Sequence, residues 1–444
     1  MVRRFAEPSS DLPVRIRSRI RLIRDRVGTF LCKKEAEIMI GLKKRTLEFM
    51  WRHNGPRSRL ETGSEFGVNL AGYFTGRFGI AASARAFATA LAIAQVPNVL
   101  NNVVSATHGE RHFGSHAFTD TNPYAINLIH VNPDTAEEFI LSRTSLLRGP
   151  RYFKDRYNIG IWYWETSNFP ARWMSLFRFY DEIWVTTSFV LQSLSRVSPV
   201  PVVKMRYPLA IDTNVIDSGA RRSLGLQEDQ CVFLFLFDFA SVLERKNPLG
   251  LIRAFEQAFG RTRKLASKSN KAVLVLNHIN SVLNPRGARM LEDASANLNV
   301  KILSRHLSDQ EYLSILAACD CYVSLHRSEG LGLPMAEAMY LAKPVIATAY
   351  GGNSDFMNTN NSLPLRYELV ELDKDYCPYE KGNVWAEPDV AQAAELMRWV
   401  YENRELAKRI GQRAADDIRE SMNPTKASHE IRTRLERVYS KLVR

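Results

Sequence analysis

The 444-residue chain is 45% hydrophobic, which is enough apolar material for two sizeable cores. Its net charge of +13 is uneven, because residues 1–60 hold 16 Lys or Arg against 6 Asp or Glu and so carry ten of those charges. The five cysteines are odd in number and lack paired C-x-x-C spacing, so they imply no metal or disulfide framework. They are predicted to be reduced, partly buried thiols: Cys32, Cys231, Cys319, Cys321 and Cys377.

Residues 1–60 are predicted to form a basic amphipathic arm. Within it, VRIRSRIRLIRDRV (residues 14–27) places Ile16, Ile20, Ile23 and Val27 at helical spacing among arginines. Such a helix can lie on an anionic membrane surface, and the alternatives are a helix docked on its own protein or a solvated tail. No nucleic-acid motif accompanies the charge, so nucleic acid is not an expected partner.

The chain is expected to stay in the cytoplasm, where the arm could hold it at the inner face of the membrane. The first residues lack a hydrophobic signal region. The apolar stretch Gly79–Leu100 is interrupted by Arg85, so it favours a soluble helix over a membrane span.

Alternating strand and helix patterns predict an α/β protein with two doubly wound parallel sheets. The first domain, residues 61–211, begins with the strand GVNLAGYF and a glycine-containing turn into a helix. The second, residues 212–424, follows a polar linker at 212–229. Further strands are expected at 125–130, 159–164, 182–186 and 200–205, and then at 231–237, 272–276, 300–303, 321–325 and 344–348. Residues 425–444 are expected to form a C-terminal helix that can pack back on the first domain.

The stretch HRSEGLGLPMAEAM (residues 326–339) predicts a strand, a glycine-rich turn and a helix. Its turn, Gly330-Leu331-Gly332-Leu333, lets backbone approach a ligand, and the amides of the new helix can receive an anion. Glu337, expected in the first helical turn, and Glu329, in the loop, could border one crevice. A phosphate on the amides and sugar hydroxyls on the carboxylates would describe a nucleotide-sugar site.

This stretch resembles the E-x7-E motif of retaining GT-B glycosyltransferases of family 4, the glycosyl transferases group 1. The resemblance extends from about residue 67 to the C-terminus. It implies two Rossmann-like domains facing a cleft, a nucleotide diphosphate sugar as donor, and retention of anomeric configuration. In that family reading Glu337 holds the ribose hydroxyls and Glu329 contacts the donor sugar.

The segment FDFASVLERKNPLGLIRAF (residues 237–255) looks like the family's diphosphate loop, in which Lys246 matches the lysine that holds the diphosphate. Many members have an arginine five positions earlier, where this chain has Ser241. Arg245 is the candidate for the second cation, and a basic surface loop is the alternative.

The first domain carries GRFGIAASAR (residues 76–85), which includes Gly79 and resembles the family's glycine-rich loop near the transferred sugar. Residues 158–173 and 181–189 resemble the corresponding segments of enzymes that transfer mannose or other hexoses to bacterial surface polysaccharides. Where many members have a donor-contacting histidine, this chain has Trp164-Glu165. His130 and Glu165 are therefore the candidates to replace that histidine in catalysis.

We therefore expect a hexosyltransferase that acts on a saccharide or lipid-linked acceptor without metal or cofactor. Lys246 and the turn amides would supply the positive charge that a metal supplies elsewhere. The sequence Asp373-Lys-Asp375 imitates a metal-binding D-x-D but lies in a polar loop. A sugar-nucleotide epimerase and an inactive nucleotide-sugar-binding scaffold are the alternatives.

Overall fold

The computed structural model describes residues 64–103, 117–141, 150–260 and 271–443. They belong to one compact unit that spans residues 56–444. The basic arm predicted for residues 1–60 lies outside the described residues, as does Cys32.

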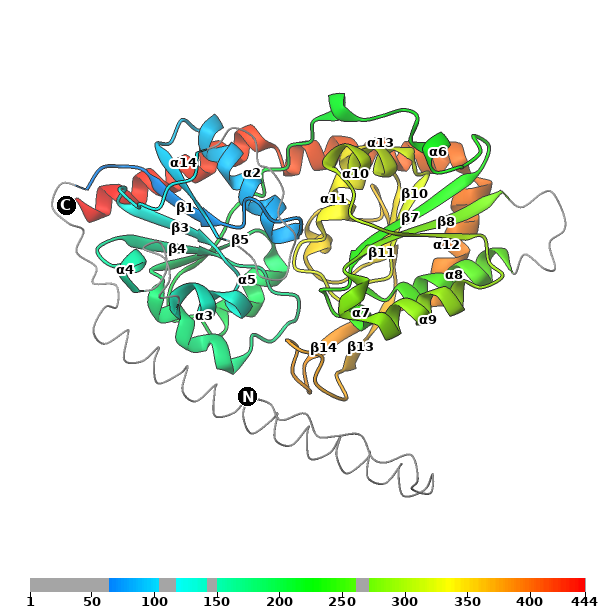
Figure 1. Cartoon of the computed structure of the whole chain (residues 1–444), viewed down its shortest axis with the longest axis horizontal. Helices are drawn as coiled ribbons and strands as arrows, with labels where there is room; N and C mark the ends of the chain where they lie inside the picture. The colour runs from blue at the N-terminus through cyan, green and yellow to red at the C-terminus, as the bar shows by residue number, and fades with distance from the viewer. Residues whose placement is uncertain (1–63, 104–116, 142–149, 261–270, 444) are drawn as a thin grey trace, which may run out of the picture. The chain divides into compact units, whose positions relative to one another are not determined.

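The first domain is built on a six-stranded parallel sheet with the order β2-β1-β3-β4-β5-β6 (Figure 1). From β1 the chain passes first to β2 on one side and then to β3 on the other, so the switch point lies between β1 and β3. There Gly72 is paired with His130 at the ends of the two strands. The strands are β1 (Val68–Gly72), β2 (Asn98–Asn102), β3 (Ile126–His130), β4 (Tyr157–Ile161), β5 (Glu182–Val185) and β6 (Val202–Lys204).

The second domain has a six-stranded parallel sheet with the order β12-β11-β10-β7-β8-β9. Its switch point lies between β7 and β10. Because β7 and β8 are buried on both faces, they are almost continuous apolar runs. The strands are β7 (Cys231–Asp238), β8 (Ala272–Ile279), β9 (Val300–Ser304), β10 (Cys321–Ser324), β11 (Val345–Thr348) and β12 (Leu363–Leu365).

Helices connect these strands and cover the sheets. Those of the first domain are α2 (Gly79–Ile93), α3 (Pro133–Leu141), α4 (Pro150–Phe153), η1 (Ala171–Phe179) and α5 (Ser188–Ser195). Those of the second are η2 (Thr213–Val215), α6 (Ala220–Ser223), α7 (Leu243–Lys246), α8 (Pro248–Phe259), η4 (Ser281–Leu283), α9 (Pro285–Ser295), α10 (Asp309–Ala318), α11 (Leu333–Tyr340), η5 (Gly352–Asp355), α12 (Val390–Glu402) and α13 (Arg404–Ser421).

The two doubly wound sheets confirm the predicted fold class, while several element predictions were wrong in detail. The strand expected at 159–164 is β4, which starts earlier and ends at Ile161. The polar or short strands β2 and β12 were missed. So was an antiparallel hairpin of β13 (Tyr367–Glu371) and β14 (Val384–Pro388), inserted between β12 and α12.

The last helix, α14 (Pro424–Leu442), contacts α2 of the first domain (Figure 1). Arg432 donates to the carbonyl of Ala94 at 2.8 Å, and Tyr439 donates to that of Ser64 at 3.0 Å. Arg434 also pairs with the buried carboxylate of Glu182. The C-terminal residues are thus part of the first domain's packing.

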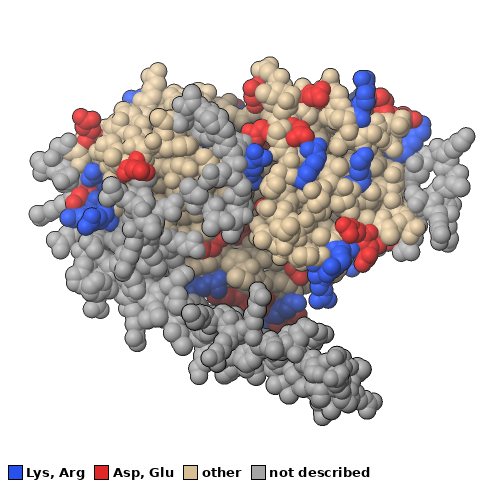
Figure 2. All heavy atoms as spheres, in the orientation of Figure 1, with Lys and Arg blue, Asp and Glu red and all other residues tan. Residues whose placement is uncertain are grey.

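Basic and acidic side chains alternate over the described surface in view (Figure 2). This agrees with the sequence, since residues 61–444 carry only three of the thirteen net positive charges. Within the described ranges, no helix combines the length and the apolar character needed to cross a bilayer.

Candidate active site

Two loops of the second domain meet at its switch point. One follows β7 and carries the short helix α7 with Lys246 at its end, and the other follows β10 and leads into α11. Asn247 joins them, because its Nδ2 donates to the carbonyl of Leu325 at 2.9 Å. Its left-handed backbone ends α7, and its Oδ1 caps α8 by accepting from the amide of Gly250. Lys246 is thereby held beside the glycine-rich turn.

Glu329 lies between two cations. Its Oε1 accepts from Lys246 Nζ at 2.5 Å, and its Oε2 lies 3.3 Å from Arg245 Nη1. The Arg245 side chain is only 5% exposed, and it also donates to the carbonyl of Ser328 at 2.8 Å and to the hydroxyl of Ser241 at 3.4 Å. Both cations therefore point to Glu329, and the surface-loop interpretation of Arg245 is wrong.

These ion pairs keep Glu329 ionised. Burial by itself would raise the pKa of this carboxyl group, but Lys246 and Arg245 lower it to about 2. Burial lowers the pKa of Lys246, and the carboxylate of Glu329 opposes that shift. Glu329 is therefore ionised at neutral pH and lies between the two basic side chains.

The glycine-rich turn places backbone amides beside this cluster. Gly332 has a φ of +86°, which glycine adopts without strain, and α11 begins directly after it. Thr187 of the first domain donates to the carbonyl of Gly330 at 2.8 Å. The amides of Gly330, Leu331 and Gly332 donate no hydrogen bond to any described residue. They are available to an anion at the amino end of α11.

Glu337 has different surroundings. Since α11 begins at Leu333, this glutamate lies in the second helical turn and not, as predicted, in the first. Its Oε2 accepts a hydrogen bond from the Tyr312 hydroxyl. Burial raises the pKa of Glu337 to about 7, and the hydrogen bond from Tyr312 only partly opposes this. The carboxyl group is therefore half protonated near neutral pH.

Glu165 is brought to the same region from the first domain. Its Oε2 accepts from the Tyr379 hydroxyl at 3.1 Å, and its carbonyl accepts from the Ser328 hydroxyl. A Cβ at Gly330 would lie 3.1 Å from the carbonyl oxygen of Trp164, so this position has little room for a side chain. Trp164 and Glu165 thus adjoin the turn that follows β10.

The two other candidates of the first domain are His130 and Gly79. His130 ends β3 with no exposed surface, and its Nε2 forms a hydrogen bond with the Ser83 hydroxyl at 2.8 Å. Burial lowers the pKa of His130 to about 3, so the ring is neutral. Its catalytic role stays a prediction. Gly79 opens α2, and a Cβ there would meet no atom within 4 Å.

The described residues contain no cluster of three or more His, Cys, Asp or Glu side chains arranged to hold a metal ion. Asp373 and Asp375 are exposed in the loop between β13 and β14. The Asp375 Oδ1 accepts from the amide of Lys381 at 2.8 Å, which gives that carboxylate a role in the loop.

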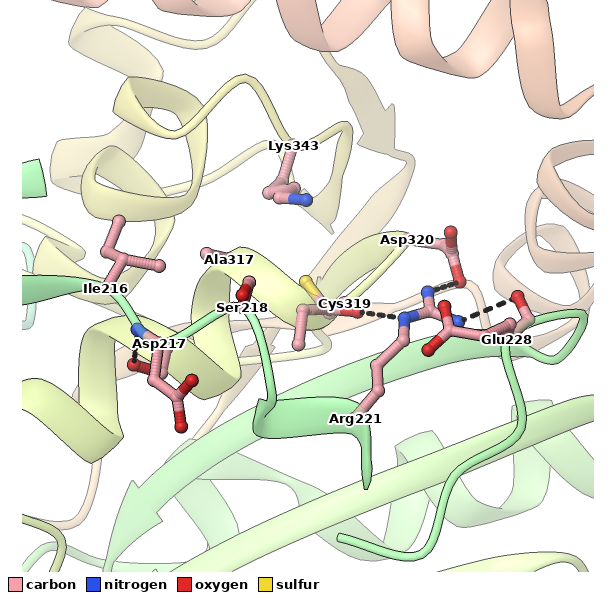
Figure 3. A pocket seen from close by; sticks show the side chains of 11 residues that line it. Ile216, Asp217, Ser218, Arg221, Glu228, Ala317, Cys319, Asp320 and Lys343 are labelled. Carbon is pink, nitrogen blue, oxygen red and sulfur yellow. Dashed lines mark hydrogen bonds and ion pairs between the residues drawn. The ribbon is translucent and has the colours of Figure 1, made fainter. Parts of the chain in front are cut away.

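A pocket of about 370 Å³ lies at the opposite end of the second sheet (Figure 3). It adjoins Asp320, which directly precedes β10, whereas the candidate site follows β10. Arg221 crosses this pocket to reach Asp320 at 2.7 Å and the carbonyl of Ala318 at 3.0 Å (Figure 3). Since these contacts tie α6 to the start of β10, we assign the pocket no part in the candidate site.

Sequence patterns pointed to Glu329, Lys246 and Arg245, which the structure brings together, but missed the hydrogen-bond partners of Glu337 and Glu165. Tyr312 and Tyr379 belong to no motif. Tyr379 lies 214 positions from Glu165 along the chain, so only the folded structure could join them.

The two sheets and their switch points define the GT-B fold, which two solved structures with TM-scores above 0.5 share. Sucrose-phosphate synthase from Thermosynechococcus elongatus aligns with 85% of this chain and 100% of its own, with a TM-score of 0.60 and 14% identity. HepE from Anabaena, in complex with UDP-glucose, aligns over 85% and 100%, with a TM-score of 0.54 and 13% identity. The match to TarM from S. aureus covers 71% of this chain and 56% of that one, with a TM-score of 0.49 and 16% identity.

Residues 220–417 match the family model of glycosyl transferases group 1. This segment lies within the second domain and contains Lys246, Glu329 and Glu337. No curated protein matches the sequence.

Proposed function

We propose that the protein is a retaining glycosyltransferase that moves a hexose from a nucleotide diphosphate sugar to a saccharide or lipid-linked saccharide. The convergence of Lys246, Arg245 and the unpartnered amides of residues 330–332 at one switch point carries this proposal. The group 1 family match over the same domain supports it.

Transfer breaks the bond between the anomeric carbon and the diphosphate while negative charge grows on the leaving group. Fixed cations and amides at that position stabilise the transition state more than the ground state. Without a bound donor, Glu329 neutralises part of the positive charge of Lys246 and Arg245 through its ion pairs with both. A bound diphosphate would replace Glu329 as the partner of these two cations. Glu329 would then be able to accept a hydrogen bond from a hydroxyl of the transferred sugar.

Glu337 is proposed to hold the ribose of the nucleotide. An ionised carboxylate accepts hydrogen bonds from both hydroxyls of a diol, and Tyr312 already fixes one of its oxygens. Because Glu337 lies eight positions after Glu329, on α11, the diphosphate at the turn and the ribose at the helix would be neighbours.

The positive side chains and amides make a metal unnecessary in this scheme, so activity is expected to persist in excess EDTA. Complete loss of activity that manganese or magnesium restores would contradict this part of the proposal. The exposed pair Asp373 and Asp375 would be the first place to look for the ion.

Polysaccharide biosynthesis at a membrane surface is proposed as the setting. The support is the charge of residues 1–60, which hold ten of the thirteen net positive charges. Basic residues near an anionic surface contribute about 1 kcal/mol each, so reversible and salt-sensitive binding is expected.

Thermal unfolding in the presence of UDP, GDP, dTDP and ADP tests the proposal. A bound nucleotide at a hundred times its dissociation constant should stabilise the fold by about 2.7 kcal/mol. The matching nucleotide sugar should then be consumed with acceptor, or hydrolysed slowly without one. A chain that responds to none of the four nucleotides would contradict the proposed function, whereas a chain that binds one without turnover would be the scaffold.

A further inference from the structure

The hairpin inserted between β12 and α12 connects both carboxylate-bearing segments of the candidate site. On the second-domain side, the Arg327 guanidinium pairs with Glu387, and the amide of Ala386 donates to the Arg327 carbonyl at 2.8 Å. On the first-domain side, Arg172 pairs with Glu380 at 2.9 Å, and Asn383 donates to the Thr166 hydroxyl at 2.9 Å. The hairpin and its loop therefore lie against the segment that carries Glu329 and the segment that carries Glu165.

Tyr379, in this loop, contacts residues of the candidate site from both domains. Its side chain is buried, with only 3% exposed, and its ring centroid lies 5.4 Å from that of Trp164. The Arg245 guanidinium lies 5.8 Å from the ring centroid on its face. Its hydroxyl donates to Glu165 Oε2 at 3.1 Å. One aromatic side chain thus contacts both Arg245, the cation that is proposed to bind the diphosphate, and Glu165, the carboxylate of the first domain.

Glu165 has one oxygen fixed and one available. Oε2 accepts from Tyr379, whereas Oε1 accepts no hydrogen bond from any described side chain or amide. Burial opposes the charge of Arg245, but Tyr379, Glu329 and Glu165 together raise its pKa above the ordinary value, so Glu165 lies within electrostatic reach of that cation. A sugar on a diphosphate bound at Arg245 would have hydroxyls near this oxygen.

We propose that Tyr379 is a positioning residue that orients Glu165, and that Glu165 accepts a hydrogen bond from a hydroxyl of the donor sugar. The inference rests on the proposed function, since it requires a nucleotide sugar at Lys246 and Arg245. It adds sugar recognition by a side chain of the first domain, at the place where the sequence lacks the expected histidine, and it gives the inserted hairpin a function.

Calorimetric titration with matched ligands tests this inference. The probes are the nucleoside diphosphate that gives the largest thermal shift and its sugar conjugate: UDP-glucose, GDP-mannose, dTDP-glucose or ADP-glucose. Tyr379→Phe removes only the hydroxyl and keeps the ring under Arg245. It should weaken binding of the nucleotide sugar about 5- to 10-fold, because the hydrogen bond that orients Glu165 is lost, and leave binding of the free nucleotide within twofold.

Two further variants separate positioning from packing. Glu165→Gln should weaken the nucleotide sugar at least as much, and Tyr379→Phe in that background should have no further effect. The control is Tyr376→Phe in the same loop, whose hydroxyl lies 3.4 Å from Asp373 and which should bind both probes like wild type.

The outcomes are distinct. Equal weakening of free nucleotide and nucleotide sugar by Tyr379→Phe, or additive effects in the double variant, would overturn the positioning role while leaving the proposed function intact. Failure of wild type to bind any of the four nucleotides would overturn the proposed function itself, and this inference with it.

Discussion

The two glutamates of one motif, Glu329 and Glu337, lie eight positions apart and have opposite electrostatic surroundings. Glu329 is enclosed by Lys246 and Arg245, which lower its pKa to about 2. Glu337 accepts from the neutral hydroxyl of Tyr312, and burial raises its pKa to about 7. The comparison shows that one motif gives its two carboxylates different neighbours, and that these neighbours decide how fully each carboxylate is charged.

The largest expected effect comes from removing the cation that Glu329 shares with the donor. Lys246→Ala should reduce turnover on the order of 10²- to 10³-fold, because the leaving diphosphate loses a fixed positive charge. Steady-state kinetics of nucleotide release would measure this. Lys343→Ala, at the opposite end of the sheet, is the matched control and should retain wild-type rates. An unchanged rate in Lys246→Ala would move the role to another residue.

A smaller effect is expected from the titration of Glu337. If the ionised carboxylate holds the ribose hydroxyls, nucleotide affinity should rise as the pH passes upward through about 7, by roughly tenfold between pH 6 and pH 8. Calorimetry at several pH values would follow this. Glu337→Gln should bind the nucleotide weakly, with an affinity that does not change over the same pH range. If the substitution leaves the pH dependence of affinity unaltered, the titrating group is not Glu337.

The smallest expected effect is on stability, where the two glutamates should differ in sign. Glu329 has a folded pKa below its ordinary 4.5, so its contribution is present above about pH 4.5 and is lost as the pH falls toward 2. Glu337 has a raised folded pKa, so its contribution is present below about pH 4.5 and is lost as the pH rises through 7. Urea unfolding of Glu329→Gln should show a weaker loss of stability on the acid side, and Glu337→Gln a weaker loss of stability between about pH 4.5 and pH 7. Identical profiles in both variants would contradict the assignments.

The central strands of both sheets were predictable because buried parallel strands are continuous apolar runs, as in β7 and β8. The edge strand β2 has the sequence NVLNN, and its asparagines hide the pattern. In the inserted hairpin, β13 has the sequence YELVE and is almost wholly exposed, so it lacks the buried apolar face that marks the other strands. Its position between the domains depends on contacts such as Arg172 with Glu380, which no local pattern encodes.

The candidate site was predictable to the same limited extent. Glu329, Glu337 and Lys246 belong to motifs with a physical reason for their spacing. The direction of Arg245 could not be predicted, because adjacent side chains can diverge, and the structure turns both cations to Glu329. The charge states of the two glutamates could not be predicted from the sequence either. That of Glu337 depends on burial and on Tyr312, which lies 25 positions before it.

The central claim is that Glu337 binds the nucleotide and Glu329 does not. Calorimetric titration of the nucleoside diphosphate into Glu329→Ala and Glu337→Ala tests it most directly. Glu337→Ala should lose about tenfold or more in affinity, since hydrogen bonds from the ribose to a charged group are lost. Glu329→Ala should bind as tightly as wild type or more tightly, because Lys246 and Arg245 are freed for the diphosphate. Equal nucleotide affinity in wild type and Glu337→Ala would contradict the account.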